Sequence, residues 1–418
     1  MERCDVLVVG AGLAGLACAR GLAAAGIRTV LVDQKRALGE RIHTTGIFVR
    51  RTLEDFALPD DCLGPAVRHV VLYSPSRRRL ALASQHDEFR VGHMGALYQR
   101  LREDAAAAGA EVWSGHRLVS ARTTVAGVEV ALEEVGAAAG PRRRIRAGFV
   151  VGADGARSPV AAHLGLDRNR AFLIGAEDVL PSALGSGEPP VMHCFVDPDL
   201  APGYLAWVVD DGHEAHVGVA GDPARFRPLA ALAAFRAGLA GLVPLSRGAR
   251  IERRGGRIPV GGLLRRIASQ RALLVGDAAG AVSPLTAGGL DPCLRQSRLA
   301  VDVICAWLGD GRREALDAYQ APALRRRFRG RMLMRRVFDR LHNRTAAELA
   351  LAALRAPPLA PVAGRVFFGR GSFPDLDLER LLAETARPRL AGLATLLPRR
   401  SSTRPRYSVG AAAGRWRW

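Results

Sequence analysis

Three glycines spaced as Gly10-x-Gly12-x-x-Gly15 form the motif of this chain with the clearest chemistry. An apolar run precedes them, a helical pattern follows, and a second apolar run ends on Asp33. In a strand–turn–helix–strand unit of this kind, Gly10 permits a tight turn, Gly12 lets the backbone approach a pyrophosphate, and Gly15 lets helix and strand pack closely. The helix N-terminus offers N–H groups to the phosphates, and Asp33 is placed to accept from a ribose hydroxyl. The spacing predicts a dinucleotide site; the alternative is an ordinary strand–helix–strand unit without a ligand.

Two further glycine–acid pairs, Asp154-Gly155 and Gly276-Asp277, each follow an apolar run typical of a buried strand. After the second pair, a glycine-rich loop leads into a helical pattern from Leu290 to Leu308. The chain has only one complete glycine fingerprint. A flavoprotein with two Rossmann domains would need a second one for its nicotinamide cofactor.

Composition narrows the class of partner. The chain has 418 residues and a net charge of +20, but Lys35 is its only lysine among 60 basic residues, which indicates a coding bias. No zinc spacing or nucleic-acid motif accompanies the charge, so neither a nucleic-acid partner nor a metal site is expected. The six cysteines are scattered and favour a reducing, cytoplasmic location. No run of about 20 apolar residues predicts a membrane span. The oligomeric state is left open.

The remaining patterns place the motifs in an α/β fold. Residues 94–108 read as a helix, 118–123 and 128–133 as a hairpin, 172–221 as antiparallel strands, and 229–242 as a helix. We therefore expect a Rossmann-like dinucleotide-binding domain built from discontinuous segments, with an inserted mixed β-sheet substrate domain and a C-terminal helical region. The expected boundaries are 1–66, 92–165 and 266–310 for the first domain, 67–91 and 166–265 for the second, 311–397 for the helical region, and 398–418 for a disordered basic tail.

The C-terminal third carries a basic amphipathic pattern from Leu324 to Leu341, with Gly330 near its middle. Such a helix can lie on an anionic membrane, or it can pack on the dinucleotide-binding domain with its arginines in solvent. If the helix lies on a membrane, we expect a cytoplasmic protein in peripheral contact with the inner face of that membrane. Residues 376–386 read as another helix.

The three glycine-containing motifs, in this order and spacing, resemble the group-A flavoprotein pattern of the p-hydroxybenzoate hydroxylase superfamily. Within it, the segment LLVGDAAGAVSPLTAGGL (residues 273–290) and the segment PGYLAWVVDDGHEAHVGVAG (residues 202–221) are similar to the geranylgeranyl reductase family. The resemblance covers roughly residues 4–310. It implies FAD, reduced by NADPH or NADH from a transient site, and hydride transfer to a carbon–carbon double bond of a lipophilic, isoprenoid-like substrate.

The resemblance also implies which residues surround the cofactor. The ADP half would lie on the first motif, Asp277 would accept from the ribityl chain, and the loop after it would lie against the flavin ring. The full set expected at FAD is Gly10, Ala11, Gly12, Leu13, Ala14, Gly15, Asp33, Gln34, Arg41, Gly46, Gln99, Leu118, Asp154, Gly155, Gly276, Asp277, Gly288, Gly289 and Leu290. Tyr204 and Trp207 are expected to line the substrate cavity, with plain core packing as the alternative.

The catalytic candidates lie in the loop after the second strand. Many family members have a cysteine–glycine loop there, whereas this chain has Ile42-His43-Thr44-Thr45-Gly46. Reduction of an alkene needs a proton as well as a hydride, and His43 titrates near neutral pH, while Thr44 and Thr45 can hydrogen-bond flavin or substrate. Three other functions use the same scaffold: a monooxygenase acting on a hydrophobic or aromatic molecule, a halogenase, and a non-catalytic flavin-binding paralogue. The halogenase is disfavoured because Lys35, the single lysine, stands beside the predicted adenosine site.

Overall fold

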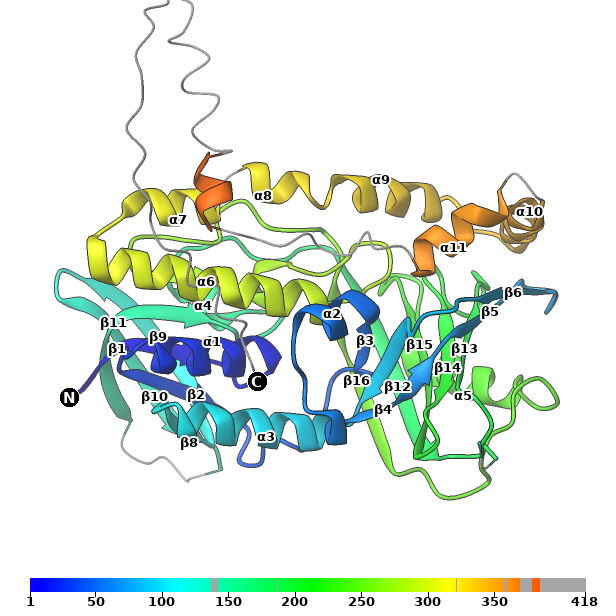
Figure 1. The fold of residues 1–418 in the computed structure, drawn as a ribbon, viewed down its shortest axis with the longest axis horizontal. Coiled ribbons are helices and arrows are strands. Elements are labelled where there is room, and N and C mark those ends of the chain that lie inside the picture. Colours follow the sequence, from blue (N-terminus) through cyan, green and yellow to red (C-terminus); the bar gives the residue numbers. More distant parts are fainter. Residues whose placement is uncertain (137–141, 186, 321, 357–358, 369–377, 384–418) are drawn as a thin grey trace, which may run out of the picture.

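The computed structural model describes residues 1–136, 142–185, 187–320, 322–356, 359–368 and 378–383. Figure 1 shows two β-rich halves side by side, with a band of helices running along one side of both. Within the described ranges, no helix is long and apolar enough to cross a membrane. The predicted basic tail at 398–418 lies outside the described residues.

The first half contains a seven-stranded sheet whose central strands are parallel. Its path is β8-β2-β1-β11-β10-β9, and β17 pairs with β11. The parallel core is completely buried because helices cover it, which is why its sequence is a continuous apolar run rather than an alternating one. The strands are β1 (Glu2–Val9), β2 (Thr29–Asp33), β8 (Glu111–Ser114), β9 (His116–Thr124), β10 (Gly127–Glu134), β11 (Arg143–Gly152) and β17 (Ala272–Leu274).

Helix α1 (Leu13–Ala24) packs against both α3 (Met94–Ala107) and α6 (Leu290–Asp310). The helices predicted at 94–108 and from Leu290 are therefore present, the second extending two residues beyond Leu308. Two shorter helices, α4 (Pro159–His163) and α7 (Arg313–Tyr319), complete this half, together with the 3-10 turn η2 (Gly276–Ala279). The glycine motif thus lies where the parallel strand β1 meets the N-terminus of α1.

The second half is a seven-stranded mixed sheet covered on one face by α5 (Pro228–Ala237). Its order is β16-β12-β15-β14-β13-β5-β6. Side chains alternate along each strand: on β5, Val71 and Tyr73 join the apolar cluster under α5, while Val70 and Leu72 join a cluster on the opposite face. The strands are β5 (His69–Tyr73), β6 (Arg79–Ala83), β12 (Phe172–Pro181), β13 (Val191–Phe195), β14 (Ala206–Asp210), β15 (Glu214–Gly221) and β16 (Glu252–Pro259).

A small antiparallel sheet lies where the two halves meet (Figure 1). It has the order β3-β7-β4, with β3 (Ile47–Val49), β4 (Leu63–Val67) and β7 (Phe89–Gly92), and it is accompanied by α2 (Arg50–Asp55) and the 3-10 turn η1 (Asp60–Cys62). Its strands come from segments that the sequence assigns to different domains. The predicted domain boundaries remain a prediction.

The C-terminal region forms α8 (Pro322–Arg326), α9 (Arg329–Phe338), α10 (Arg344–Arg355) and α11 (Ala360–Phe368). The amphipathic pattern over Leu324–Leu341 is helical but interrupted, and Gly330 already counts against one continuous helix. The break lies between α8 and α9, where the buried Phe328 side chain packs into the core. The helix predicted at 229–242 also ends early, at Ala237, just before Gly238. Of the helix predicted at 376–386, residues 378–383 are described and helical.

Candidate functional site

One cavity of about 1750 Å³ connects the two halves of the molecule. Single small-molecule pockets in proteins usually measure about 300–1,000 Å³, so this cavity has room for a large cofactor and a second molecule. One end is lined by the glycine motifs and the other by the C-terminal helices, with the second sheet between them. All predicted site residues line it except Gly15, Arg41 and Gln99.

The three glycines of the first motif differ in what an added methyl group would meet. At Gly10, where φ is +102°, a Cβ would lie 2.3 Å from the Ala153 carbonyl oxygen, and at Gly15 it would lie 1.7 Å from the Gly10 oxygen. At Gly12 a Cβ would meet nothing within 4 Å. Gly10 and Gly15 are thus required by the fold, while the open space at Gly12 faces the cavity and fits a pyrophosphate approaching the backbone at the start of α1.

The predicted ribose end is occupied by contacts within the protein. Asp33 accepts the backbone N–H of Ala11 at 2.6 Å and that of Lys35 at 2.7 Å, and it lies on the cavity wall beside Gln34 and Leu118. Arg41 is exposed with a positive φ of 49°, and Gln99 is exposed on α3 against Gly39. The structure therefore brings Asp33, Gln34 and Leu118 together at the cavity and leaves Arg41 and Gln99 outside its wall.

The two acids of the later motifs have different surroundings. Asp154 accepts from the hydroxyl of Ser158 at 2.7 Å and from the N–H of Val160 at 2.8 Å, so it caps α4. Desolvation raises the pKa of Asp154 to about 6 despite these hydrogen bonds. Desolvation also raises the pKa of Asp277 to about 6, and the Asp277 carboxylate faces Gly289, in the glycine-rich loop before α6. Asp277 is therefore the better placed of the two acids to accept from a cofactor hydroxyl.

The segment Ser283–Leu290, here called the flavin loop, closes one side of the cavity and ends at α6. Gly288, Gly289 and Leu290 line the cavity at the N-terminus of this 21-residue helix, whose dipole stabilises negative charge there. Two groups tie the loop to other parts of the chain. The Tyr204 hydroxyl donates to the Thr286 carbonyl at 2.5 Å, and Arg331 of α9 donates to the hydroxyls of Ser283 at 3.0 Å and Thr286 at 3.4 Å.

The candidate catalytic loop lies opposite, on the second sheet. His43 Nδ1 is 3.0 Å from the Gly255 carbonyl oxygen, which can only accept, so this nitrogen carries a proton. The Thr44 carbonyl accepts from Arg254 at 3.1 Å, and the Thr45 hydroxyl donates to Glu177. The three predicted residues thus lie side by side on the cavity wall, attached to β12 and β16.

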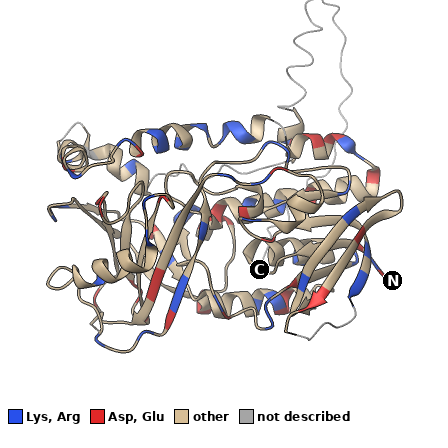
Figure 2. Cartoon of the chain, turned by 180° about the vertical axis from the view of Figure 1, so that it is seen from behind, with Lys and Arg blue, Asp and Glu red and all other residues tan. Residues whose placement is uncertain are grey.

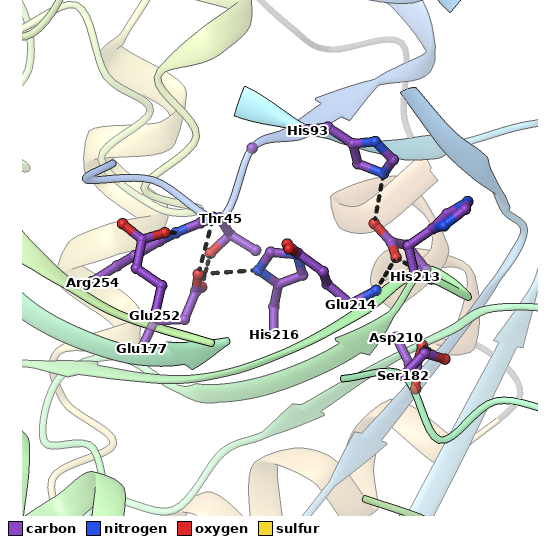
Figure 3. Close-up of polar contacts among 12 residues, drawn as sticks. Thr45, His93, Glu177, Ser182, Asp210, His213, Glu214, His216, Glu252 and Arg254 are labelled. Atoms are coloured by element: carbon purple, nitrogen blue, oxygen red, sulfur yellow. Dashed lines mark hydrogen bonds and ion pairs between the residues drawn. The ribbon is translucent and has the colours of Figure 1, made fainter. Parts of the chain in front are cut away.

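A buried polar cluster on the second sheet was missed by the sequence reasoning. Glu177 on β12 lies at its centre and accepts from Thr45 and from His216 Nδ1 at 3.2 Å (Figure 3). It also accepts from Trp207 Nε1 at 3.2 Å. The Arg254 guanidinium lies 3.6 Å from Glu177 and 2.7 Å from Glu252. The signal in the sequence is that charged residues interrupt mostly apolar strands, with Glu177 and Asp178 in FLIGAEDVLP and His216 in EAHVGVAG.

These contacts set the ionisation of the pair. Burial would raise the pKa of Glu177, but its hydrogen bond with His216 and the neighbouring positive charges lower that pKa below its ordinary value. Burial would lower the pKa of His216, but the Glu177 carboxylate raises it above its ordinary value. Both shifts favour the charged forms, so Glu177 and His216 stabilise each other as an ion pair.

The predicted substrate residues lie where the two halves meet. Trp207 crosses from β14 over β15, where a Cβ on Gly218 would lie 2.1 Å from the indole ring, so glycine at that position makes room for the side chain. Tyr204 is buried and reaches the flavin loop. Both residues line the cavity and both are also packed against other core residues.

Beyond Trp207 the cavity becomes apolar. Its wall there combines one face of the second sheet with the C-terminal helices, and the lining side chains are Leu72, Met192, Cys194, Val196, Leu333, Met334, Val337, Phe338, Leu341, Leu351, Leu354, Val362, Val366, Phe367 and Phe368. We call this part the apolar chamber. Leu333 and Val337 of α9 line it while remaining more than half exposed, so they mark its mouth.

Comparison with known proteins places the cofactor. Residues 3–217 match the family model described as "FAD binding domain". The digeranylgeranylglycerophospholipid reductase of Methanothrix thermoacetophila is 30% identical over 331 residues, covering 76% of this chain and 82% of that protein. FAD is therefore the cofactor of this chain.

Solved structures share the fold. A geranylgeranyl bacteriochlorophyll reductase-like protein from Thermoplasma acidophilum has a TM-score of 0.68 at 22% identity, covering 95% of this chain and 100% of its own. A p-nitrophenol 4-monooxygenase from Pseudomonas putida has a TM-score of 0.61 at 19% identity, covering 96% of this chain and 100% of its own. The scaffold is thus common to flavin reductases and monooxygenases. The chain belongs to the geranylgeranyl reductase family of FAD-dependent oxidoreductases, within the p-hydroxybenzoate hydroxylase-like group-A flavoproteins, and it is an enzyme.

Proposed function

We propose that this enzyme reduces a carbon–carbon double bond of a lipophilic, isoprenoid-like substrate, with NADPH or NADH as the source of electrons. One observation carries the proposal: the cavity that holds the FAD motifs continues without interruption into the apolar chamber. A polar or short substrate would not need such a chamber, whereas a polyprenyl chain gains free energy from every methylene group buried in it. The relatives' names, digeranylgeranylglycerophospholipid reductase and geranylgeranyl diphosphate reductase, point the same way.

The residues that line the cavity would have separate roles in binding and catalysis. Ala11, Gly12, Leu13 and Ala14 would hold the pyrophosphate, and Asp277 with the flavin loop would hold the ribityl chain and the ring. The chemistry that reduced FAD would supply when bound is a hydride for one carbon of the double bond. His43, Thr44 and Thr45 would position the double bond at the cavity wall, and Tyr204 and Trp207 would line the passage from this wall to the apolar chamber. Trp207 and α9 would cover the cavity and so keep water away from the reacting carbons.

We also propose that the substrate enters at α9 from a membrane surface, with the enzyme at the inner face of the membrane. Leu333 and Val337 are exposed beside the chamber, and arginines surround them on the same helix. Figure 2 shows basic residues along this helical band. An exposed apolar patch bordered by arginines is typical of a helix that lies in an anionic lipid interface.

The test is mass spectrometry of lipids that copurify with the yellow holoenzyme, before and after anaerobic reduction with dithionite. A gain of two hydrogens in a bound polyprenyl species supports the reductase. A bound species that changes only when oxygen is admitted, gaining one oxygen atom, would instead support a monooxygenase. Reduced flavin that discharges to no lipophilic alkene or aromatic acceptor would support the non-catalytic paralogue.

A further test addresses the catalytic loop. We expect His43→Ala to lower product formation more than it lowers FAD content, because the imidazole lies on the cavity wall away from the glycine motifs. Unchanged turnover at normal FAD loading would remove His43 from the mechanism.

A further inference from the structure

The buried polar cluster on the second sheet lies on a face that is otherwise apolar. Along β15, Ala215, Val217 and Val219 point into the apolar cluster under α5, while His216 points to the opposite, cavity side. Glu177 occupies the corresponding side of β12. Buried ion pairs seldom stabilise a protein more than apolar side chains of similar volume would. The fold alone therefore gives no reason for an acid and a histidine at these two positions.

The cluster extends from the cavity wall toward solvent, and Figure 3 shows Thr45, Glu177 and His216 linked in a row with the Glu214 side chain beside the imidazole ring. It starts at the Thr45 hydroxyl on the cavity wall, which is hydrogen-bonded to one oxygen of Glu177, while the other oxygen lies 3.2 Å from His216 Nδ1. On the far side of the imidazole, His216 Nε2 lies 3.9 Å from a carboxylate oxygen of Glu214. The His216 side chain is 2% exposed and that of Glu214 is 32% exposed. The cluster thus leads from the cavity wall, through the buried His216, to the Glu214 carboxylate, which is partly exposed to water.

We propose that Thr45, Glu177, His216 and Glu214 form a proton relay that supplies the proton needed when the double bond is reduced. This inference rests on the proposed function. Glu177 first takes the Nδ1 proton of His216 and, now a carboxylic acid, passes a proton to the Thr45 oxygen as the hydroxyl proton of Thr45 forms the new C–H bond at the second carbon. His216 is left as a neutral ring that keeps its proton at Nε2, and it takes up one proton from solvent on the Glu214 side to restore the imidazolium before the next turnover. One alkene, one reduced nicotinamide and one proton give one alkane and one oxidised nicotinamide.

The ionisation of the pair suits this role. Because Glu177 raises the pKa of His216, the ring keeps its proton to a higher pH than an ordinary histidine does. The charged groups that face His216 are Glu177 from β12, Glu214 from its own strand, Arg254 from β16 and Asp211 from the β14–β15 turn. Arg254 opposes the charge on His216, so the proton is held less tightly than the carboxylate alone would hold it.

His43 is the competing proton source. Its Nδ1 proton is committed to the Gly255 carbonyl, so a neutral His43 presents an unprotonated Nε2 to the cavity. The Thr45 hydroxyl also donates to an acceptor, Glu177, but that carboxylate can receive a proton from His216, which frees the hydroxyl proton for the cavity and replaces it afterwards. The two routes are separable because His43 has no contact with Glu177 or His216 among those the structure shows.

The experiment compares His216→Gln with a matched control, His193→Gln, in the FAD-loaded enzyme. His193 lies on β13 of the same sheet, hydrogen-bonded to Tyr73 and outside the cavity wall. After anaerobic reduction of the flavin, we expect a lipophilic alkene to reoxidise it at least 100-fold more slowly in His216→Gln and at an unchanged rate in His193→Gln. Glu177→Gln should match His216→Gln, and Glu177→Asp should recover part of the rate because it restores a carboxylate.

A second readout does not depend on turnover. In the holoenzyme labelled with ¹⁵N-histidine, the His216 nitrogens should report an imidazolium at pH 7, and Glu177→Gln should convert it to a neutral ring. Equal rates in His216→Gln and His193→Gln, or a neutral His216 in the unmodified holoenzyme, would overturn the relay. If the unmodified enzyme reduces no alkene while its His216 is charged and coupled to Glu177, the proposed reaction fails and the coupled pair stands.

Discussion

The two glycines Gly12 and Gly15 respond in opposite ways to an added methyl group. We expect Gly12→Ala to keep the melting temperature of the FAD-free protein and to weaken FAD binding about 10- to 100-fold, because its Cβ would fill only the space of the pyrophosphate. Gly15→Ala should destabilise the fold by more than about 3 kcal/mol, because its Cβ would lie 1.7 Å from a carbonyl oxygen. Thermal unfolding and FAD titration separate the two. Unaltered FAD affinity in Gly12→Ala would place the pyrophosphate elsewhere.

The Asp277 carboxylate should lower the stability of the FAD-free protein and contribute to FAD binding. Its pKa is raised from 3.8 to about 6, so above pH 6 the folded FAD-free protein bears the full cost of a desolvated carboxylate. Asp277→Asn should therefore stabilise the FAD-free protein by about 2 kcal/mol at pH 7, allowing for water in the cavity. The gain should shrink as pH falls through 6 and vanish below 3.8.

The same substitution should weaken FAD binding about tenfold, because a charged acceptor for the ribityl hydroxyls is lost. Chemical denaturation at pH 7 and pH 5, together with FAD titration, measures both effects. A variant that is less stable at pH 7, or one that binds FAD as tightly as the unmodified chain, would contradict this role for Asp277.

At the scale of elements, α9 fastens the flavin loop through Arg331, which donates to Ser283 and Thr286. We expect Arg331→Met to raise the FAD dissociation constant about tenfold, since a hydrogen bond to a charged donor contributes about 1.5 kcal/mol. The exposed Arg336 of the same helix is the control, and Arg336→Met should leave FAD binding unchanged. Equal effects of the two substitutions would show that α9 acts through its overall charge alone.

The elements also show where sequence reasoning works. The strongly periodic helices α3 and α6 and the apolar strands β1 and β11 were predicted, because one burial pattern repeats along each of them. Strand β16 was missed, because its Arg-Arg-Gly-Gly segment has neither apolar alternation nor strand-forming residues. The break at Phe328 was missed because tertiary packing of that side chain decides it.

The candidate site was also predicted only in part from the sequence. The glycine motifs could be located because their spacing is local, and the structure brings them to a single cavity. The Glu177–His216 pair could not be predicted, because its two members are 39 positions apart and meet only through the pairing of β12 with β15. Arg254, which completes the cluster, lies on the strand that was missed.

At the scale of the whole molecule, the charge and the exposed apolar residues of α9 predict binding to anionic lipid. We expect the double substitution Leu333→Asp and Val337→Asp to reduce cosedimentation with phosphatidylglycerol vesicles at least fivefold, because both side chains are exposed at the mouth of the chamber. Val125→Asp is the matched control, since Val125 is completely exposed on the β9–β10 turn. Equal losses in the two proteins would contradict docking through α9.

The central claim is that electrons pass from the nicotinamide through FAD to a carbon–carbon double bond. It is tested most directly by anaerobic turnover with a polyprenyl alkene, measuring NAD(P)H consumed and product mass together. We expect the enzyme to consume one NAD(P)H per double bond and to form a product heavier by two hydrogens, with oxygen absent throughout. Product that forms only when oxygen is present, with one oxygen atom incorporated for each NAD(P)H, would contradict it.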